Sequence, residues 1–418
     1  MTRRTKAEPL AVKKLTQNTV PAKKQRTGHH KRSNSAAQKK NAQKLLSAMF
    51  DEANKFGLDN LRSARVAAVA GLTTGAIYSR YENADEMLIA LWQERVAAPF
   101  LQHIRDVVQY VQGVLPTKHP VLLMLEKPSA TLRLGVEFLV VAARNDAVAE
   151  VVTPAVVAVL DDLGLNEHSD AMAGAIVMIS ASAAIGTASR SFITGTNPGW
   201  SSSLLALRSA ATRAVPLPHE PFPYDMPGDQ INTGNPIRDL LLTSAEQIVG
   251  RVGFRNATVT RIARRAGFST SAIYQMWPDK DAMLDEAIHE TSLLDFGQNA
   301  RAKVAASTTA RGDFGFSDSW YFGLMPSRRL RHKFRLECVI ASRHRPSTRR
   351  ELQEYVKSAD SILHVTFPKI PHATIAQIAS MEQALGYGYL TLNPMVSQAS
   401  RLDYFSIMVV LASFAQLS

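Results

Sequence analysis

The sequence "AGFSTSAIYQMW" at residues 266–277 occurs earlier in altered form as "AGLTTGAIYSRY" at residues 70–81. The two stretches lie 196 positions apart, and matches continue around them without a gap. Further along the chain the offset is 200, as for Glu137/Glu337 and Gly186/Gly386. The sequence therefore predicts that the chain is a tandem repeat of one unit. The matches at offset 196 are Leu45/Leu241, Leu46/Leu242, Gly57/Gly253, Asn60/Asn256, Arg65/Arg261, Ala67/Ala263, Gly71/Gly267, Thr74/Thr270, Ala76/Ala272, Ile77/Ile273, Tyr78/Tyr274, Asp85/Asp281, Met87/Met283 and Leu88/Leu284.

Apolar residues recur with a helical period in both copies. In residues 41–57 the stripe consists of Leu45, Met49 and Ala53, flanked by Leu46 and Phe50. The second copy repeats this stripe, and a glycine follows each one, at Gly57 and Gly253, where it is expected to end the helix. Alternation typical of strands is weak throughout, so we expect an all-α protein. The stripe of the second copy is Ile237, Leu241, Ala245 and Ile248.

Two short helices joined by a glycine turn are expected after each of these stops. Thr258 is placed to cap a helix over 259–266, and Ser269 to cap the next one. Gly267 between them allows a tight turn. In the first copy Arg62 stands where Thr258 does, so Ser63 is the alternative cap. Such a pair of helices is the helix-turn-helix unit, whose second helix enters the major groove of DNA.

The helical period separates an inner face from an outer face in each unit. Most of the outer residues have small hydroxyl or amide side chains, which can meet base edges or phosphates. Tyr78 and Tyr274 are long enough to reach a phosphate; the alternative is that they only cover the core. The inner residues are Val66, Ala67, Ala70, Ala76, Ile77, Ile262, Ala263, Ala266, Ala272 and Ile273; the outer ones are Thr73, Thr74, Gly75, Ser79, Arg80, Ser269, Thr270, Ser271 and Gln275.

The pattern of residues 258–284 resembles the DNA-binding domain of the tetracycline-repressor (TetR) family of transcriptional regulators. The resemblance implies an N-terminal three-helix DNA-binding unit and a larger helical domain that binds a small effector and dimerises through its last two helices. Each half has the length of one such subunit, so the chain resembles two subunits fused head to tail. The residues that carry the resemblance are Thr258, Ile262, Ala263, Ala266, Gly267, Ser269, Ile273, Tyr274, Trp277, Lys280 and Leu284.

The resemblance also implies which side chains contact DNA. It implies phosphate contacts from Tyr78, Tyr274 and Lys280, and base contacts from the hydroxyl-rich residues of both second helices. Ala84 replaces the expected lysine in the first copy, where arginines are expected to supply the phosphate charge. The candidate DNA-binding residues are Arg62, Ser63, Arg65, Thr73, Thr74, Gly75, Tyr78, Ser79, Arg80, Thr258, Thr260, Arg261, Ser269, Thr270, Ser271, Tyr274, Gln275 and Lys280.

The positive charge of the chain is concentrated at its N-terminus. The net charge is +12, and residues 1–40 hold twelve Lys and Arg against the single acid Glu8. Such a segment has too little apolar content to form a core, so residues 1–41 are expected to be a disordered basic arm that neutralises phosphates. The alternative is a tail that only aids solubility. The domains expected after it are a first DNA-binding domain (42–97), a first helical regulatory domain (98–214), a Pro-rich linker (215–235), a second DNA-binding domain (236–289) and a second regulatory domain (290–418).

Several classes of function are disfavoured. The sequence has no HExxH, Walker loop, paired CxxC or G-x-S-x-G motif, so no catalytic residue, cofactor or metal is expected. No convincing membrane span is found, and the single Cys338 fits a cytoplasmic protein. We therefore expect a regulator, acting as an effector-responsive repressor, that binds double-stranded DNA as an intrachain pseudo-dimer with two unequal half-sites. The alternative is a helical partner-binding or scaffold protein in which one or both units no longer bind DNA. The small-molecule effector and a further homodimer are left open.

Overall fold

The computed structural model describes residues 29–219, 230–307, 312–313 and 315–416. The regular elements in these residues are all helices, with no strand among them. The prediction of an all-α protein is confirmed for this part of the chain. Residues 1–43 and 44–418 form two units. The contacts described below lie within the second unit.

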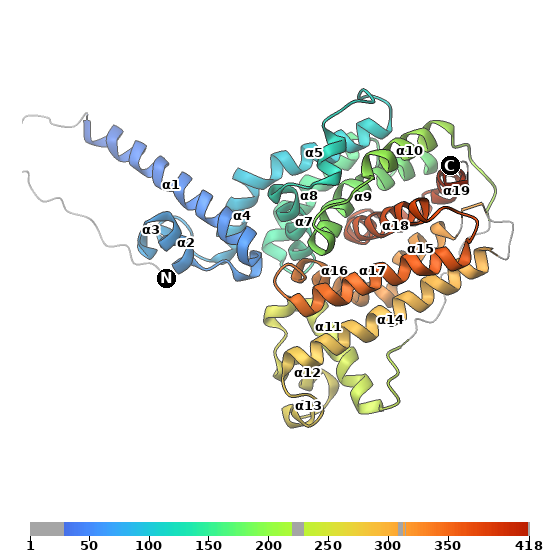
Figure 1. The fold of residues 1–418 in the computed structure, drawn as a ribbon. Helices are drawn as coiled ribbons and strands as arrows, with labels where there is room; N and C mark the ends of the chain where they lie inside the picture. Colours follow the sequence, from blue (N-terminus) through green and yellow to red (C-terminus); the bar gives the residue numbers. More distant parts are fainter. Residues whose placement is uncertain (1–28, 220–229, 308–311, 314, 417–418) are drawn as a thin grey trace, which may run out of the picture. The chain divides into compact units, whose positions relative to one another are not determined.

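The two halves of the second unit follow the same order of helices (Figure 1). Residues 44–214 are called the first half. They begin inside α1 (His29–Phe56), the helix that crosses the boundary between the two units. They contain η1 (Leu58–Asn60), α2 (Ser63–Ala70), α3 (Thr74–Tyr78), α4 (Ala84–Leu91), η2 (Trp92–Val96), α5 (Ala97–Val111), α6 (Val121–Glu126), α7 (Ala130–Ala142), α8 (Asp146–Asp162), α9 (Ala171–Thr194) and α10 (Trp200–Arg213).

Residues 236–416, called the second half, repeat this order. They contain α11 (Pro236–Asn256), α12 (Val259–Ala266), α13 (Thr270–Met276), α14 (Lys280–Ser307), α15 (Phe316–Leu324), η3 (Pro326–Arg328), α16 (Arg329–Ala341), α17 (Pro346–Thr366), α18 (His372–Leu392), η4 (Asn393–Met395), η5 (Ala399–Arg401) and α19 (Tyr404–Gln416). A single long helix, α14, takes the place that α4, η2 and α5 hold in the first half.

The N-terminal arm departs from the expectation where the structure describes it. Helix α1 begins at His29, so the expected disorder of residues 29–41 is wrong. Residues 36–40, "AAQKK", have high helix propensity and lead directly into the apolar stripe, which explains the longer helix. Residues 1–28 lie outside the described residues, and the arm stays a prediction there.

The expected stripes and stops are confirmed for most residues. Leu45, Met49 and Ala53 are buried, as are Leu241 and Ala245 of the second stripe. Ile237 is wrong as a core residue, since it is 43% exposed in the first turn of α11. Gly57 and Gly253 adopt φ values of 84° and 75°, which are open to glycine and strained for other residues. Both residues therefore turn the chain out of its first helix.

Helices α9 and α18 pack against each other at backbone contact, and they lie side by side in Figure 1. A Cβ added to Gly186 would lie 1.6 Å from the Ala384 carbonyl oxygen, and one on Gly388 would lie 2.0 Å from that of Ser182. As α18 advances from Ala384 to Gly388, α9 runs back from Gly186 to Ser182, so the two helices are antiparallel. Helices α10 and α19 pack against each other and against this pair. The four helices form a bundle that joins the halves.

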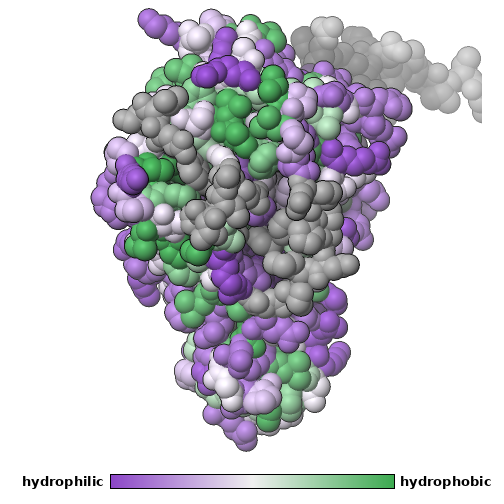
Figure 2. Space-filling model, turned by 90° about the vertical axis from the view of Figure 1, so that its right-hand side faces the viewer, coloured by the Kyte–Doolittle hydropathy of each residue, from purple (hydrophilic) through white to green (hydrophobic). Residues whose placement is uncertain are grey.

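Helix α9 is apolar over most of its length. Among the helices in the described residues, it alone is long and apolar enough to cross a membrane by length and composition. However, 78% of its most apolar window is buried inside the protein. On the face of the molecule drawn in Figure 2, hydrophobic residues form separate groups among hydrophilic ones. The apolar character of α9 is therefore that of a helix packed on protein.

The segment between the halves carries no helix in its described parts. Helix α10 ends at Arg213, and α11 begins at Pro236 with the side chain of Asn235 as its cap. The backbone N–H of Leu217 donates to Ser406 Oγ of the second half at 2.8 Å. Residues 220–229 of the predicted linker lie outside the described residues.

Candidate nucleic-acid interface

The second helix-turn-helix unit is formed by α12 and α13. Thr258 Oγ1 accepts a hydrogen bond from the Arg261 backbone N–H at 3.3 Å, which confirms the first predicted cap. Gly267 has a left-handed conformation and ends α12. The predicted inner residues Ile262, Ala263, Ala266 and Ile273 are buried, while Ala272 is half-buried. The turn and the small core therefore have the predicted design.

The opposite face of this unit presents polar side chains to solvent. The Tyr274 side chain is 57% exposed, so its phenol lies on the surface. Ser269 precedes α13 as expected, but its hydroxyl does not cap the helix; it lies 2.6 Å from Ser271 Oγ. The second predicted cap is wrong because the Ser269 hydroxyl bonds to the Ser271 hydroxyl rather than to a backbone N–H at the start of α13. The other exposed candidates in this unit are Thr258, Thr260, Arg261, Thr270 and Gln275.

Trp277 fastens the end of α13 to the first and last helices of the unit. Its indole Nε1–H donates to Glu286 Oε2 on α14 at 2.8 Å. Arg238 of α11 forms an ion pair with the same carboxylate and lies over the Trp277 ring, 4.9 Å from its centroid. Burial opposes ionisation of Glu286, but hydrogen bonds from Arg238 and Trp277 lower its pKa. The sequence pattern includes Trp277, yet its partners lie too far along the chain to be paired with it by spacing.

Lys280 is engaged within the protein. Its Nζ donates to the Phe254 carbonyl oxygen at 3.4 Å, across the turn that follows α11. This hydrogen bond joins the start of α14 to the end of α11. To contact a phosphate directly, the Lys280 ammonium would have to give up its bond to the Phe254 carbonyl oxygen. Arg264, which was not among the candidates, is exposed on α12 three residues before the Gly267 turn. Its basic side chain next to the turn is the sequence signal that points to it.

The first unit, α2 and α3, has the same local geometry with a different cap. Gly71 is left-handed, and Val66, Ala67, Ala70 and Ile77 are buried as predicted. Ser63 is wrong as the cap because it is already the first helical residue, whereas a capping residue must precede the helix. Arg62 takes that position without a side-chain hydrogen bond to the backbone, and the Ser63 hydroxyl contacts Met87 Sδ at 3.5 Å.

Arg65 and Arg261, at equivalent positions, bind equivalent carbonyl groups. Arg65 donates to the Asn60 carbonyl oxygen, and Arg261 donates to that of Asn256 at 3.1 Å. Arg65 also binds Glu52 at 2.7 Å and lies over the Phe56 ring. These contacts fasten α2 and α12 to the turns before them, a positioning role that leaves Arg65 little freedom to contact DNA.

The remaining candidates of the first unit lie on its surface. Tyr78 is 63% exposed, close to the value for Tyr274. Arg80 forms an ion pair with Glu94 at 3.7 Å and donates to Tyr81 Oη. The hydroxyl of Ser79, which directly follows α3, donates to the Ala76 carbonyl oxygen of that helix. The exposed candidates are Arg62, Thr73, Thr74, Gly75, Tyr78, Ser79 and Arg80.

Residues 241–287 match the model of the family described as bacterial regulatory proteins, tetR family. This match supports membership of the tetR family. The matched residues cover most of α11, all of α12 and α13, and the start of α14, which is the unit that holds Trp277 and Tyr274. No curated protein matches the chain significantly. Since tetR-family proteins are regulators rather than enzymes, the match indicates a DNA-binding transcriptional regulator.

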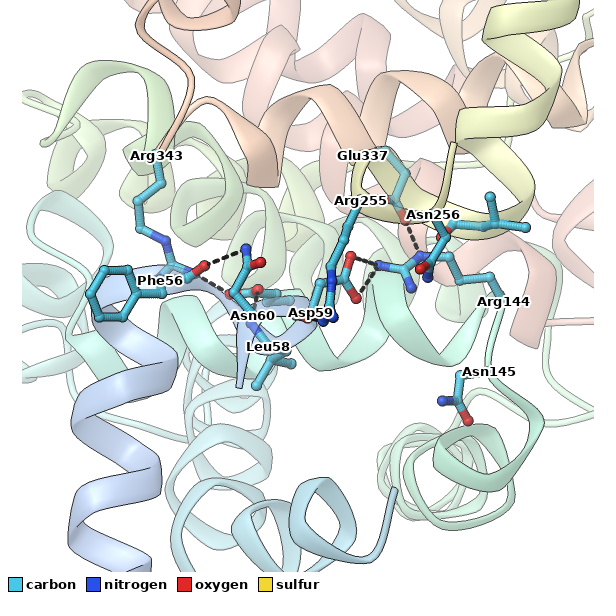
Figure 3. Close-up of polar contacts among 12 residues, drawn as sticks. Phe56, Leu58, Asp59, Asn60, Arg144, Asn145, Arg255, Asn256, Glu337 and Arg343 are labelled. Carbon is cyan, nitrogen blue, oxygen red and sulfur yellow. Dashed lines mark hydrogen bonds and ion pairs between the residues drawn. The ribbon is translucent and has the colours of Figure 1, made fainter. Parts of the chain in front are cut away.

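Near the end of α11, a cluster of ion pairs connects the two halves (Figure 3). Arg144, which follows α7, lies between two carboxylates: its Nε binds Glu337 of α16 at 2.5 Å, and its Nη2 binds Asp59 of η1 at 2.9 Å. Burial raises the pKa of Glu337 to about 7, against the opposing effect of Arg144. One buried guanidinium therefore binds both carboxylates at once, through different nitrogen atoms.

A second ion pair joins the halves the other way round, with its arginine in the second half and its glutamate in the first. Arg343, which follows α16, binds Glu137 of α7. Glu137 also accepts a hydrogen bond from the Leu58 backbone N–H at 2.5 Å, so it holds the turn after α1. Arg255 of α11 donates to the Asp59 carbonyl oxygen, and these two residues stand at equivalent positions of the repeat. This cluster was not predicted from the sequence, although Glu137 and Glu337 stand at matched positions of the repeat.

Proposed function

We propose that the chain is a fused pseudo-dimer: a single polypeptide that carries two helix-turn-helix units and binds two unequal half-sites of double-stranded DNA. A helix-turn-helix protein usually binds as a pair, with recognition helices about 34 Å apart in successive major grooves. A homodimer supplies the pair from two chains. In this chain the exposed residues of α3 and α13 differ, so the two half-sites are expected to differ as well.

The crossed ion pairs are the observation that carries this proposal. In a two-fold symmetric dimer, a residue of one subunit contacts a partner on the other and the reverse contact is repeated. Arg144 binds Glu337 while Arg343 binds Glu137, which is such an exchange between two halves of one chain. Gly57 and Gly253 follow the same rule, since Cβ atoms added to them would meet His344 at 3.3 Å and Arg144 at 2.9 Å, respectively.

Contacts between non-identical residues favour a fused pair over a pair of identical chains. Asp59 and Arg255 occupy equivalent positions and carry opposite charges, and Arg255 binds the backbone of Asp59. In a symmetric dimer of identical chains these two positions would hold the same residue, so an arginine could not meet an aspartate there. The family resemblance implies that two subunits dimerise through the last two helices of each. In this chain α9 and α10 of the first half pack against α18 and α19 of the second half, so the same pairing occurs within one polypeptide.

Within this proposal the exposed residues have separate roles. Tyr78 and Tyr274 contact phosphates, and the hydroxyl side chains at the starts of α3 and α13 contact bases. Arg62, Arg80, Thr260, Gln275 and Lys280 contribute further contacts to the backbone or groove. The regulator acts in the cytoplasm as an effector-responsive repressor; the alternative function is that of a partner-binding scaffold.

The test is the enrichment of random duplex DNA on the purified full chain, followed by light scattering of the complex to count chains. Two unequal half-sites about one helical turn apart, with one chain bound, support the pseudo-dimer. A matched pair of variants, T73A/T74A and T270A/S271A, should each relax base preference in a different half-site. A true palindrome with two chains bound would mean that one unit alone contacts bases. No enrichment at low salt would favour the scaffold alternative.

A further inference from the structure

A cavity of about 720 Å³ lies where α7 of the first half meets the second half. Helices α11, α15 and α16, the end of α18 and the segment 393–400 form its other walls. This volume lies within the range of about 300–1,000 Å³ that is common for sites of small organic ligands. The cavity is thus large enough for a ligand and is shared by both halves.

One part of the cavity wall is apolar. Side chains from α7, α15, α16 and the end of α18 contribute to it, so it is built from both halves. A ligand placed there would bury hydrocarbon against hydrocarbon, which is favourable because apolar area is removed from water. The apolar residues are Leu139, Val140, Leu324, Leu336, Leu390 and Val396.

The other part of the wall is positively charged. Arg329 and Lys333 of α16 both line the cavity, and they stand four residues apart on one helix face. Among the described residues, no carboxylate forms an ion pair with either of them; Lys333 Nζ instead donates to the Ala143 carbonyl oxygen at 2.8 Å. Burial, followed by the charges of Arg329 and Arg251, lowers the pKa of Lys333 against the opposing effect of Glu337. Neither cationic side chain at this wall is therefore held in an ion pair by a described carboxylate.

The one acid in the wall is already engaged. Glu337 is buried and binds Arg144 at 2.5 Å, so its charge is directed toward the crossed ion pairs. His332, which also lines the cavity, has its pKa lowered to about 3 by burial and by Arg328, and is neutral at ordinary pH. Glu337 acts on Lys333 through its charge, but among the described residues no carboxylate forms an ion pair with Arg329 or Lys333.

We propose that this cavity binds an amphipathic organic monoanion, such as a carboxylate with a hydrocarbon or aromatic body. The carboxylate binds Arg329 and Lys333, and the apolar body packs against Leu139 and Leu390. An inorganic anion would satisfy the charges but leave the apolar wall in contact with water. A neutral apolar molecule would leave the two cations without a partner.

The position of the cavity links its occupancy to the second helix-turn-helix unit. Gly250 of α11 lines it, and a Cβ on Gly250 would lie 2.9 Å from the Leu330 carbonyl oxygen. Helices α11 and α16 therefore approach at backbone distance beside the ligand. A bound anion is expected to change how α11 is seated on α16 and so the orientation of α13. This effect on DNA rests on the proposed function, whereas binding itself does not.

Binding is tested by calorimetric titration of the full chain, without DNA, using sodium 2-naphthoate and sodium decanoate as probes. The matched neutral probe is 2-naphthamide. We expect one site per chain and at least about tenfold weaker binding of the amide, since it lacks the charge. Equal affinity for acid and amide would overturn the ionic part of the proposal, and absence of binding by both acids up to millimolar concentration would overturn the proposal itself.

Variants locate the site. R329Q and K333Q are each expected to weaken 2-naphthoate binding by about tenfold, whereas R350Q, at an exposed arginine of α17 outside the cavity, should leave it unchanged. V140F, which narrows the cavity from the first half, should also weaken binding. Thermal unfolding of each variant identifies any that fails to fold. Folded R329Q and K333Q variants with unchanged affinity would place the anion elsewhere. If the chain binds 2-naphthoate but binds no DNA, the proposed ligand site is retained and its proposed role in regulation is overturned.

Discussion

Arg343 of the second half binds Glu137 of the first half, and the reverse exchange joins Arg144 to Glu337. Both carboxylates are buried, at 4% and 3% exposure, so neither charge is screened by water. Each pair also borders a glycine that ends the helix before a helix-turn-helix unit. A change at either pair is therefore expected to affect stability and the seating of both units together.

Removal of one partner from this cluster should be costly. R343M leaves Glu137 buried without its ion pair, and we expect a loss of about 3–5 kcal/mol in the free energy of unfolding. The double variant E137Q/R343M should recover much of that loss because the uncompensated charge is gone. Urea unfolding of both variants measures the difference. R350M, at an exposed arginine, is the control and should change stability by less than about 0.5 kcal/mol. A double variant no more stable than R343M would contradict the ionic role.

The glycine contact between α9 and α18 gives a second prediction. G186A places a Cβ 1.6 Å from the Ala384 carbonyl oxygen, so the helices must separate, and we expect a loss of at least about 2 kcal/mol. Gly386 is the matched control, because a Cβ there meets nothing within 4 Å. G386A should be neutral or more stable by about 0.5–1 kcal/mol, since alanine favours helix. Similar thermal unfolding curves for G186A and G386A would show that this contact is not close in solution.

The two exposed tyrosines allow the units to be compared directly. Y274F and Y78F each remove one phenol hydroxyl from the surface, so neither should alter thermal stability. If both hydroxyls bind phosphates, each variant should lose about three- to tenfold in affinity for the enriched duplex, as expected for one hydrogen bond. The losses should be multiplicative in the double variant. Fluorescence anisotropy measures them, and a loss in Y274F alone would assign DNA contact to the second unit only.

Residues 1–28 carry eight Lys and Arg against one Glu, which predicts a role in salt-dependent DNA binding. A variant that begins at residue 29 keeps α1 and should bind any duplex more weakly. Its plot of log affinity against log salt concentration should also be less steep, by about 0.9 for each phosphate that these residues neutralise in the full chain. Affinities measured at several salt concentrations give this slope. An unchanged slope would exclude phosphate contacts by these residues.

His103 of α5 predicts a pH dependence of stability. It is buried, and burial lowers its pKa from 6.5 to about 4. The unfolded chain therefore binds a proton before the folded one does, so stability from this group is present above pH 6.5 and is lost as pH falls through 4. The loss is of the order of 3 kcal/mol. Urea unfolding between pH 7 and pH 4 should show a smaller decrease for H103Q than for the unmodified protein; equal decreases would exclude His103 as the cause.

Local sequence pattern was a reliable guide wherever a residue's environment is made by its near neighbours. Gly71, Gly267 and the Thr258 cap have the predicted roles because a turn or a helix start involves only a few residues. It was unreliable where a hydroxyl had another partner within reach or where the helix began one residue earlier than expected. Ser269 pairs with the Ser271 hydroxyl, and Ser63 is already the first residue of α2, so neither caps its helix.

Helical period and glycine spacing were sufficient to predict the all-α fold of the described residues, the glycines that end their helices and most of the buried and exposed faces of both helix-turn-helix units. These features follow from short-range geometry that every copy of the motif shares. The crossed pairs of Arg144 and Arg343, the engagement of Lys280 by a carbonyl and the cavity beside α16 required the folded chain. Residues 193 and 206 positions apart meet in the crossed pairs, and residues of both halves meet in the cavity. These contacts depend on how whole helices pack rather than on local spacing.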